Sequence, residues 1–347
     1  MLHNNANPFL IIAMSTYGLL NQILIMYSKD KGIVLISILL IVLLLSSVAV
    51  LFGNKYFLSL KRAQYIEFQS ISLNIFRNIE SLAKDKIDKE LRFNKTKLTK
   101  NNPLISEPMV FNLNGAEIIG KITDSGNCFN INSIVTLKDG KYVENKKTTA
   151  AFRKILSLNE IDNNIIEEVI DQTIDWIDKD ANPRAFGLED YYYSGPLHSP
   201  REYTGMRLMV SIEELKSIPA VKRIDWNIFK NYFCAIPKLD ELSLNINTLD
   251  LEDAYLLSSF YSNLTIKDAE YILDNIPKSG FDDLNNFIGS FPDLDLKLAY
   301  GKITVSSNIF EVNSEMSFNE FISSSKSIII YEDNNNGFII SRIYNGI

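Results

Sequence analysis

The chain has 347 residues, a net charge of −7 and an isoelectric point near 5.1. An acidic protein of this kind is not built to bind a polyphosphate backbone. Its two cysteines, Cys128 and Cys234, are too few for a disulfide scaffold and lack the spacing of a zinc site. They are compatible with one disulfide bond in an oxidising compartment or with two buried thiols.

Residues 33–53 form a run without any charged side chain. A helix needs about 20 apolar residues to cross a hydrocarbon core, so this run is long enough to span a membrane. Each Leu, Ile or Val contributes roughly −0.3 to −0.6 kcal/mol to insertion. Charged residues flank the run on both sides, namely Lys29, Asp30 and Lys31 before it and Lys55, Lys61 and Arg62 after it. The run therefore predicts a transmembrane segment.

The helical pattern continues beyond the membrane segment. Apolar residues recur at spacings of three and four through residues 54–90, which predicts an amphipathic continuation packed on a soluble domain. We therefore expect one helix from about Ile33 to the late eighties. Residues 1–32 are interpreted as a leader. Met26 is the preferred start of the natural product, and the alternative is a long leader with a weak membrane contact.

Strands and helices then alternate in blocks. Residues 91–146 hold strand-like segments, including a hairpin signal at Asn114-Gly115. Residues 147–295 read as helices, of which Asn163–Ile177 is the strongest, and residues 296–347 return to strands. We find no convincing internal repeat. A helical block between two groups of strands predicts an α+β fold with a large inserted all-α domain.

Acidic residues gather at the end of the helix predicted over Asn163–Ile177. Asp178, Asp180, Asn182 and Glu189 stand at offsets 1, 3, 5 and 12, as in an EF-hand loop, but Pro183 stands where that loop needs glycine. Oxygen ligands of this kind suit a hard cation. The segment is read either as a cation site or as a solvated acidic helix end, and chemistry alone leaves both open. The candidate ligands are Asp175, Asp178, Asp180, Glu189 and Asp190.

Other activities find less support in the sequence. His198 is expected in a surface loop and has no serine or cysteine nucleophile near it, so a hydrolase lacks its catalytic residues. Residues 244–291 suggest a helix-hairpin-helix unit. Its hairpin, residues 261–265, has no glycine and is surrounded by acidic residues, so we expect a packing unit. A membrane-anchored nucleic-acid-binding protein remains the alternative function.

Several stretches, taken in order, resemble the K-type minor pseudopilins of type II secretion systems. The resemblance covers Lys31 to the C-terminus, and it depends on the order and spacing of its motifs rather than on any single one. These are the Lys-Gly32/Ile33 junction, Asp124…Phe129-Asn-Ile-Asn132, Asp175-Trp-Ile-Asp178, Gly187-Leu-Glu-Asp190 with Tyr192, Ser211-Ile-Glu-Glu-Leu215, Cys234-Ala-Ile-Pro237, Leu244-Asn-Ile-Asn-Thr248 and Ser307-Asn-Ile-Phe310.

The resemblance implies a fold and a function. It implies a pilin-like fold, in which a long N-terminal transmembrane helix packs on an antiparallel sheet that carries the inserted helical domain. A prepilin peptidase would cut between Gly32 and Ile33 and methylate the new amine of Ile33. The chain would then cap the tip of a periplasmic pseudopilus and help to initiate its assembly. It would bind calcium near Glu189 and Asp190 and act without enzymatic activity.

The resemblance also implies partners and a location. The partners would be the I-, J- and H-type minor pseudopilins, the prepilin peptidase and the inner-membrane assembly platform, with no nucleic acid. The protein would sit in the bacterial inner membrane with its soluble domain in the periplasm. Most pilins carry a membrane-buried Glu five residues after the cut, where this chain has Ser37. A lone carboxylate at that depth is costly, and its absence is typical of the subunit at the tip.

Overall fold

The structure, a computed structural model, describes residues 8–93, 97–239, 242–296, 299–332 and 337–346, with side chains from Ile33 onward except that of Phe93. The chain separates into two compact units, Met1–Ser70 (unit 1) and Ile71–Ile347 (unit 2). The boundary between the units falls within one helix.

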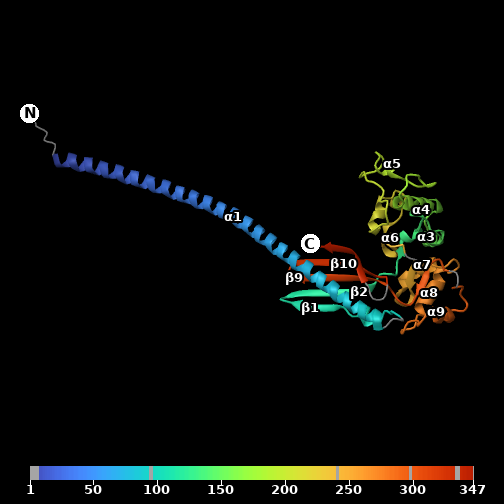
Figure 1. Ribbon diagram of the computed structural model, residues 1–347. Helices are drawn as coiled ribbons and strands as arrows, with labels where there is room; N and C mark the ends of the chain where they lie inside the picture. The colour runs from blue at the N-terminus through green and yellow to red at the C-terminus, as the bar shows by residue number, and fades with distance from the viewer. Residues whose placement is uncertain (1–7, 94–96, 240–241, 297–298, 333–336, 347) are drawn as a thin grey trace, which may run out of the picture. The chain divides into compact units, whose positions relative to one another are not determined.

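Helix α1 (Pro8–Phe93) runs through unit 1 and into unit 2 (Figure 1). It begins well before Ile33, where the sequence pattern placed its start. From Ile33 to Leu51 its apolar side chains are exposed, and the mean hydropathy reaches 3.2 over 18 residues. The described residues thus contain one helix long and apolar enough to cross a membrane. The leader and Gly32 precede the described side chains, so the cleavage junction stays a prediction.

Five antiparallel strands form the sheet of unit 2, in the order β1-β2-β9-β10-β11. The last part of α1 packs on this sheet through Phe76, Ile79, Ala83 and Ile87, which are all buried (Figure 1). A Cβ at Gly120 would lie 2.7 Å from Ile79 Cγ2, so only glycine lets the helix approach β2. The strands are β1 (Met109–Leu113), β2 (Ala116–Asp124), β9 (Ile309–Phe318), β10 (Phe321–Tyr331) and β11 (Gly337–Asn345).

The packing of α1 on an antiparallel sheet confirms the predicted fold class. The hairpin predicted at Asn114-Gly115 is also confirmed: both residues have positive φ, at 50° and 85°, and they join β1 to β2. A charge pair adds to the helix–sheet contact, because Arg342 of β11, itself exposed, donates two hydrogen bonds to the buried Glu80 of α1. The two halves of the predicted strand set therefore meet in one sheet.

The other predicted strands do not join this sheet, which corrects the sequence interpretation. In the first group, β3 (Phe129–Asn130) pairs in parallel with β6 (Phe233–Cys234), and β4 (Val135–Lys138) pairs only with β5 (Lys141–Glu144). Near the C-terminus, β8 (Lys302–Thr304) pairs in parallel with β7 (Ser243–Asn245). These short strands close the helical region rather than extend the main sheet.

The helical region fills the chain between β2 and β9. Its longest helix, α4, spans Asn163–Ile177 as predicted. Asp250 caps the turn that precedes α7, while the Thr248 hydroxyl donates to Asp124 Oδ2. The remaining helices are α2 (Pro103–Ser106), α3 (Lys146–Leu158), α5 (Asp190–Tyr193), α6 (Trp226–Tyr232), α7 (Ala254–Ser259), α8 (Ile266–Asp274) and α9 (Leu284–Ser290), and the 3₁₀ turns are η1 (Ile131–Ile134), η2 (Ile212–Ser217), η3 (Val221–Arg223), η4 (Ile246–Thr248) and η5 (Leu251–Asp253).

The helical region contains the same unit twice, contrary to the expectation that the chain has no repeat. The first lobe, residues 128–236, runs from β3 through the helix pair α3–α4 and then α6 to β6. The second lobe, residues 242–305, runs from β7 through α7–α8 and then α9 to β8. In both lobes the closing strand pairs in parallel with the opening strand.

One buried asparagine at the same place organises each lobe. Asn132 accepts from the N–H of Met209 and donates to the carbonyls of Met209 and Ile236. Asn247 accepts from the N–H of Phe281 and donates to the carbonyls of Phe281 and Val305. The matching stretches Phe129-Asn-Ile-Asn-Ser133 and Leu244-Asn-Ile-Asn-Thr248 therefore have the same structural role.

The hairpin of the second lobe presents carbonyls rather than N–H groups. The Lys154 ammonium of α3 donates to the carbonyls of Tyr261, Ser262 and Leu264, at 2.5, 3.3 and 2.7 Å. Burial lowers the pKa of Lys154 from its ordinary value. This contact joins the first lobe to the second, which gives the hairpin the packing role expected from its sequence.

Candidate metal centre

The acidic cluster lies where α4 ends. Asp178 caps the C-terminus of α4, and its N–H donates to the carbonyl of Ile174. Asp178, Asp180 and Glu189 each bring one carboxylate oxygen within 4.8 Å of the others. Glu189 is buried, Asp178 is partly buried and Asp180 is exposed. The cluster is therefore open to solvent on the side of Asp180.

Hydrogen bonds to α4 bring Glu189 back to Asp178. The N–H of Arg184 donates to Asp175 at 3.0 Å, and the N–H of Phe186 donates to Asp171 at 3.1 Å. A Cβ at Gly187 would lie 1.8 Å from Asp175 Oδ2, so this position requires glycine. The Arg184 guanidinium adds ion pairs to Asp171 and to Glu144 of β5. The loop after α4 is thus held against α4 itself, through Asp171 and Asp175.

Two oxygens of the cluster are buried without a hydrogen-bond donor, namely Asp178 Oδ1 and Glu189 Oε1. A buried polar atom normally has a partner, so these two oxygens call for one. Burial, with the neighbouring carboxylates, raises the pKa of Glu189 to about 8 and that of Asp178 to about 6. Burial and the same repulsion raise the pKa of Asp175 to about 7. These acids repel each other unless a positive charge lies between them.

The predicted ligands fall into two groups. Asp178, Asp180 and Glu189 converge. Asp175 instead accepts from the loop backbone, and Asp190 Oδ1 accepts from both the N–H and the hydroxyl of Thr204, each at 2.8 Å. Asp175 and Asp190 therefore hold the loop in place, and their oxygens in these bonds are already occupied.

Residues of the loop that sequence reasoning set aside also shape the site. His198, expected at the surface, is buried and bonds to Glu202 over 2.5 Å, with its ring 5.1 Å from that of Tyr193. Its neighbours Pro196 and Pro200 gave no signal of this burial. Trp176 is buried, and its ring centroid lies 5.0 Å from that of Tyr193. These ring contacts pack the loop after α4 against the buried Trp176 of that helix.

The donor set fits a hard cation. All three converging side chains are carboxylates, and two of them hold buried oxygens that lack a donor. Calcium takes six to eight oxygen ligands, so three carboxylates leave room for carbonyls and water. A bound cation would supply the positive charge that lets Asp178 and Glu189 stay ionised.

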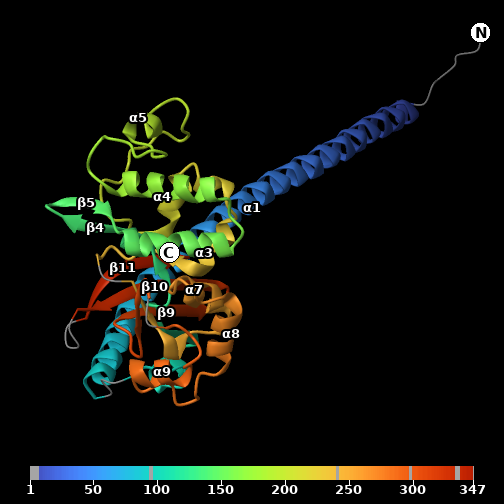
Figure 2. The same cartoon turned by 90° about the vertical axis from the view of Figure 1, so that its right-hand side faces the viewer.

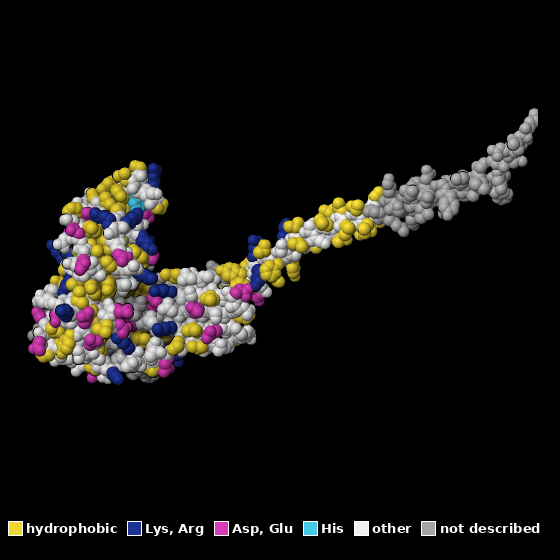
Figure 3. Space-filling model, turned by 180° about the vertical axis from the view of Figure 1, so that it is seen from behind, with side chains coloured by type: hydrophobic (Ala, Val, Ile, Leu, Met, Phe, Trp, Pro, Cys, Tyr) yellow, Lys and Arg dark blue, Asp and Glu magenta, His cyan; other side chains and the backbone are white. Residues whose placement is uncertain are grey.

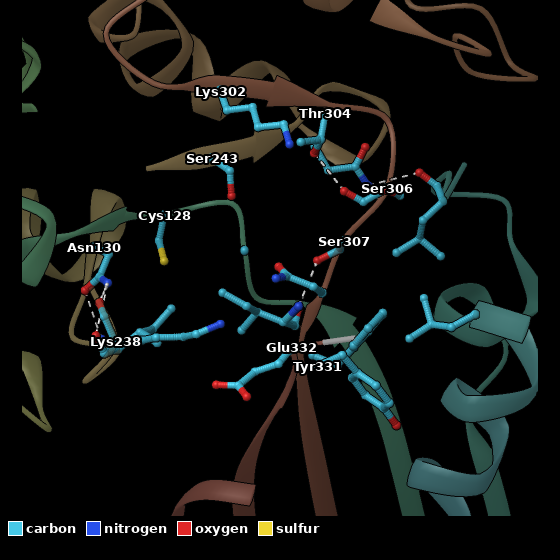
Figure 4. Close-up of a pocket in the computed structure, with 18 of the residues that line it drawn as sticks. Cys128, Asn130, Lys238, Ser243, Lys302, Thr304, Ser306, Ser307, Tyr331 and Glu332 are labelled. Carbon is cyan, nitrogen blue, oxygen red and sulfur yellow. Dashed lines mark hydrogen bonds between the residues drawn. The ribbon is translucent and has the colours of Figure 1, made fainter. Parts of the chain in front are cut away.

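A cavity of about 390 Å³ lies elsewhere, where the chain passes between the sheet and the two lobes (Figure 4). Its hydroxyls are largely engaged: Thr304 donates to the carbonyl of Ser306 at 2.7 Å, and Ser307 donates to Asp124 at 2.6 Å. None of the acids of the cluster lines this cavity. The cavity lies where several segments of the chain meet, and it is separate from the candidate metal centre.

The Cys128–Cys234 disulfide joins the ends of β3 and β6 and so closes the first lobe. The family described as type II secretion system (T2SS), protein K, matches residues 127–238, which is the same segment with a margin of a few residues. This segment contains the whole acidic cluster. The region that matches the family therefore coincides with the first lobe.

Curated relatives and a solved structure agree with that match. The type II secretion system protein K of Aeromonas hydrophila is 29% identical over 251 residues, covering 68% of this chain and 73% of the relative. That of Pectobacterium carotovorum subsp. carotovorum is 33% identical over 177 residues, covering 50% and 53%.

The crystal structure of the GspK-GspI-GspJ complex from enterotoxigenic Escherichia coli contains a chain with the same fold. Its TM-score is 0.69 at 21% identity, and the match covers 82% of this chain and 99% of that one. This chain belongs to the type II secretion system protein K family, whose members are pseudopilins.

Proposed function

We propose that this pseudopilin caps the tip of the periplasmic pseudopilus and helps to initiate its assembly. The observation that supports the proposal is the contrast between the two ends of α1. Its first half exposes apolar side chains from Ile33 to Leu51, whereas its last part is buried against a sheet. A helix of this kind sits in lipid before assembly and in a fibre afterwards. The role is structural and not enzymatic.

Ser37 supports a position at the tip. Its hydroxyl donates to the carbonyl of Ile33 at 2.6 Å, so it is satisfied inside the helix and needs no partner in the membrane. A carboxylate at this position would pair with the terminal amine of a neighbouring subunit. Without it, the chain has no such bond to offer, which suits a subunit at the end of the fibre.

The partners follow from the same reading. The related chain was crystallised in a GspK-GspI-GspJ complex. We therefore expect this chain to assemble with I- and J-type pseudopilins, and with an H-type subunit, after release by a prepilin peptidase at the inner-membrane assembly platform. The disulfide of the first lobe supports a periplasmic location for unit 2, because disulfides persist in oxidising compartments.

The cation in this proposal is calcium, held by Asp178, Asp180 and Glu189. The supporting observation is the pair of buried oxygens that lack a donor. Asp175 and Asp190 keep the loop folded so that Glu189 reaches Asp178. The cation would lock the end of α4 to the loop and has no catalytic role.

Processing tests the proposed function. Co-expression with a prepilin peptidase should give a chain that begins at a methylated Ile33, measured by intact mass and N-terminal sequencing. The Gly32→Ala variant should stay long, while the neighbouring Val34→Ala variant should be cut normally. A wild-type chain that is never shortened would contradict the assignment.

Calcium binding is tested by thermal unfolding of the full chain in detergent micelles. At a hundredfold excess over Kd, calcium should stabilise the fold by about 2.7 kcal/mol, which raises Tm by about 5–10 °C. Asp178→Ala combined with Glu189→Ala should remove this response. The matched control is Glu270→Ala combined with Asp274→Ala, at the end of α8, which should keep it. If Tm is the same in calcium and in chelator, the calcium site is misplaced.

A further inference from the structure

The two lobes differ most in one connection. In the second lobe, residues 275–280 lead from α8 to Phe281, the residue held by Asn247. In the first lobe, residues 178–208 lead from α4 to Met209, the residue held by Asn132. The short connection shows that the unit closes without a long loop. The extra length of the first connection therefore needs a reason other than folding.

This long connection exposes large apolar side chains. Leu197 is 83% exposed, Tyr203 71% and Tyr191 64%. Figures 1 and 2 place α5 and its loop beyond α4, at the end of unit 2 away from the sheet. Figure 3 shows hydrophobic side chains gathered over that end, beside Lys or Arg side chains. Exposed apolar groups in such a cluster mark interaction sites in soluble domains.

C-terminal to Asp180, which is exposed, the exposed charged side chains of this connection are arginines. Across residues 181–210, all of them described, no acidic side chain is exposed. Glu189 is buried, Asp190 is bonded to Thr204, and Glu202 is bonded to His198 and Ser217. Arg201 is exposed and makes no ion pair within the described part of the chain. Residues 181–210 hold three arginines and three acids, and Arg184 and Arg207 form ion pairs, so the distinguishing charge of this surface is Arg201.

The loop is also held in one shape. The N–H of Glu202 donates to the carbonyl of Tyr193, and the Asp190–Thr204 bonds tie α5 to the returning chain. His198 fills the space between these segments, in ring contact with Tyr192 and Tyr193. A surface fixed before binding loses little conformational freedom when a partner arrives.

We propose that Tyr191, Leu197, Arg201 and Tyr203, the tip patch, form a docking surface for a folded protein whose apolar surface is bordered by carboxylates. Tyr and Arg are enriched in protein interfaces, and Lys, Glu and Asp are depleted, as they are here. A second copy docking through the same patch would place Arg201 against Arg201. An anionic membrane surface is recognised by a cluster of several Lys or Arg side chains, whereas this patch has one arginine. The proposal does not depend on calcium binding.

Site-specific photocrosslinking of the full chain tests the tip patch in cells that make the whole secretion system. Benzoylphenylalanine replaces Leu197 in one variant. In the control it replaces Leu251, which is 52% exposed in the second lobe. We expect a discrete protein adduct from position 197, with a yield about tenfold above that from position 251. Arg201→Glu should lower the yield about tenfold, and Arg201→Lys should keep most of it.

Charge exchange then decides whether the adduct reports a specific interface. Replacing the carboxylate nearest to the crosslink in the adducted protein by Lys should restore the yield with Arg201→Glu. The melting point of the Arg201→Glu variant should equal that of the wild type, which shows that the fold is intact. The proposal is overturned by adducts only with lipid or with a second copy, by equal yields at both positions, or by failure of the exchanged charges to restore the crosslink.

Discussion

The first and second lobes of the helical region share a framework but differ in what they add to it. Both use a buried asparagine to fix the residue that follows a pair of helices, and both close with a parallel strand pair. Among the described residues of the two lobes, the first adds a disulfide, the acidic cluster and the long connection. The shared parts account for folding, so the added parts are where function is to be sought.

The disulfide should give the largest difference between the lobes. Cys128 and Cys234 are 106 residues apart, and closing a loop of this size stabilises a fold by up to about 4.7 kcal/mol. Cys128→Ser combined with Cys234→Ser should therefore destabilise the first lobe by about 3–4 kcal/mol. Hydrogen exchange should show the loss in α3 and α4 and much less in α7 and α8. Equal loss in both lobes would mean that they unfold as one unit.

The two asparagines should be equivalent if the lobes are one repeated unit. Asn132→Ala and Asn247→Ala each leave the N–H and the carbonyl of the residue they hold without this partner, whereas the carbonyls of Ile236 and Val305 keep other donors. We expect each to lower the free energy of unfolding by about 3 kcal/mol, measured with denaturant on the full chain in micelles. Asn286→Ala, on the exposed side of α9, should change it by less than about 0.5 kcal/mol. A large effect in one lobe only would break the equivalence.

The pH dependence of stability should be a smaller effect, and it should come mainly from the first lobe. Without calcium, the pKa values of Asp178, Asp175 and Glu189 lie at about 6, 7 and 8, above their ordinary values. Between about pH 4.5 and 8 the folded state then holds protons that the unfolded state has released. Stability is therefore full at low pH and falls as pH rises through this window.

The measurement for this pH dependence is Tm in chelator at pH 5, 6, 7 and 8. Tm should fall across the series, and added calcium should remove the fall because the ion stabilises the ionised carboxylates. Asp178→Asn combined with Glu189→Gln should flatten the curve. A Tm that rises with pH in chelator would show that these acids are not held close together in the folded state.

Patterns of local origin were predictable from the sequence. The bounds of α4, the Asn114-Gly115 hairpin and the capping box at Ser211 follow from side chains within a few residues of each other. The long helix, together with the two groups of strand-like segments on either side of a helical block, predicted the α+β fold class. The convergence of Asp178, Asp180 and Glu189 agrees with their EF-hand-like offsets, because a short loop limits how far they can separate.

Features that depend on distant partners were not predictable. The repeat was missed although both Asn-Ile-Asn stretches were seen, because their meaning lies in bonds to Met209 and Phe281, far along the chain. Asp190 was predicted as a ligand, and the sequence did not indicate that its Oδ1 also holds the loop by accepting from Thr204. His198 resembled a surface residue because its burial depends on Tyr192, Tyr193 and Glu202 closing around it.

Hydrogen exchange of the full chain with calcium and with chelator tests most directly whether the long connection is a cation-binding addition to a repeated unit. Calcium should slow exchange about tenfold in residues 178–208, which corresponds to about 1.4 kcal/mol of added local stability. It should leave residues 275–280 of the second lobe unchanged. No change in residues 178–208, or an equal change in both connections, would contradict the assignment of the cation site to the first lobe.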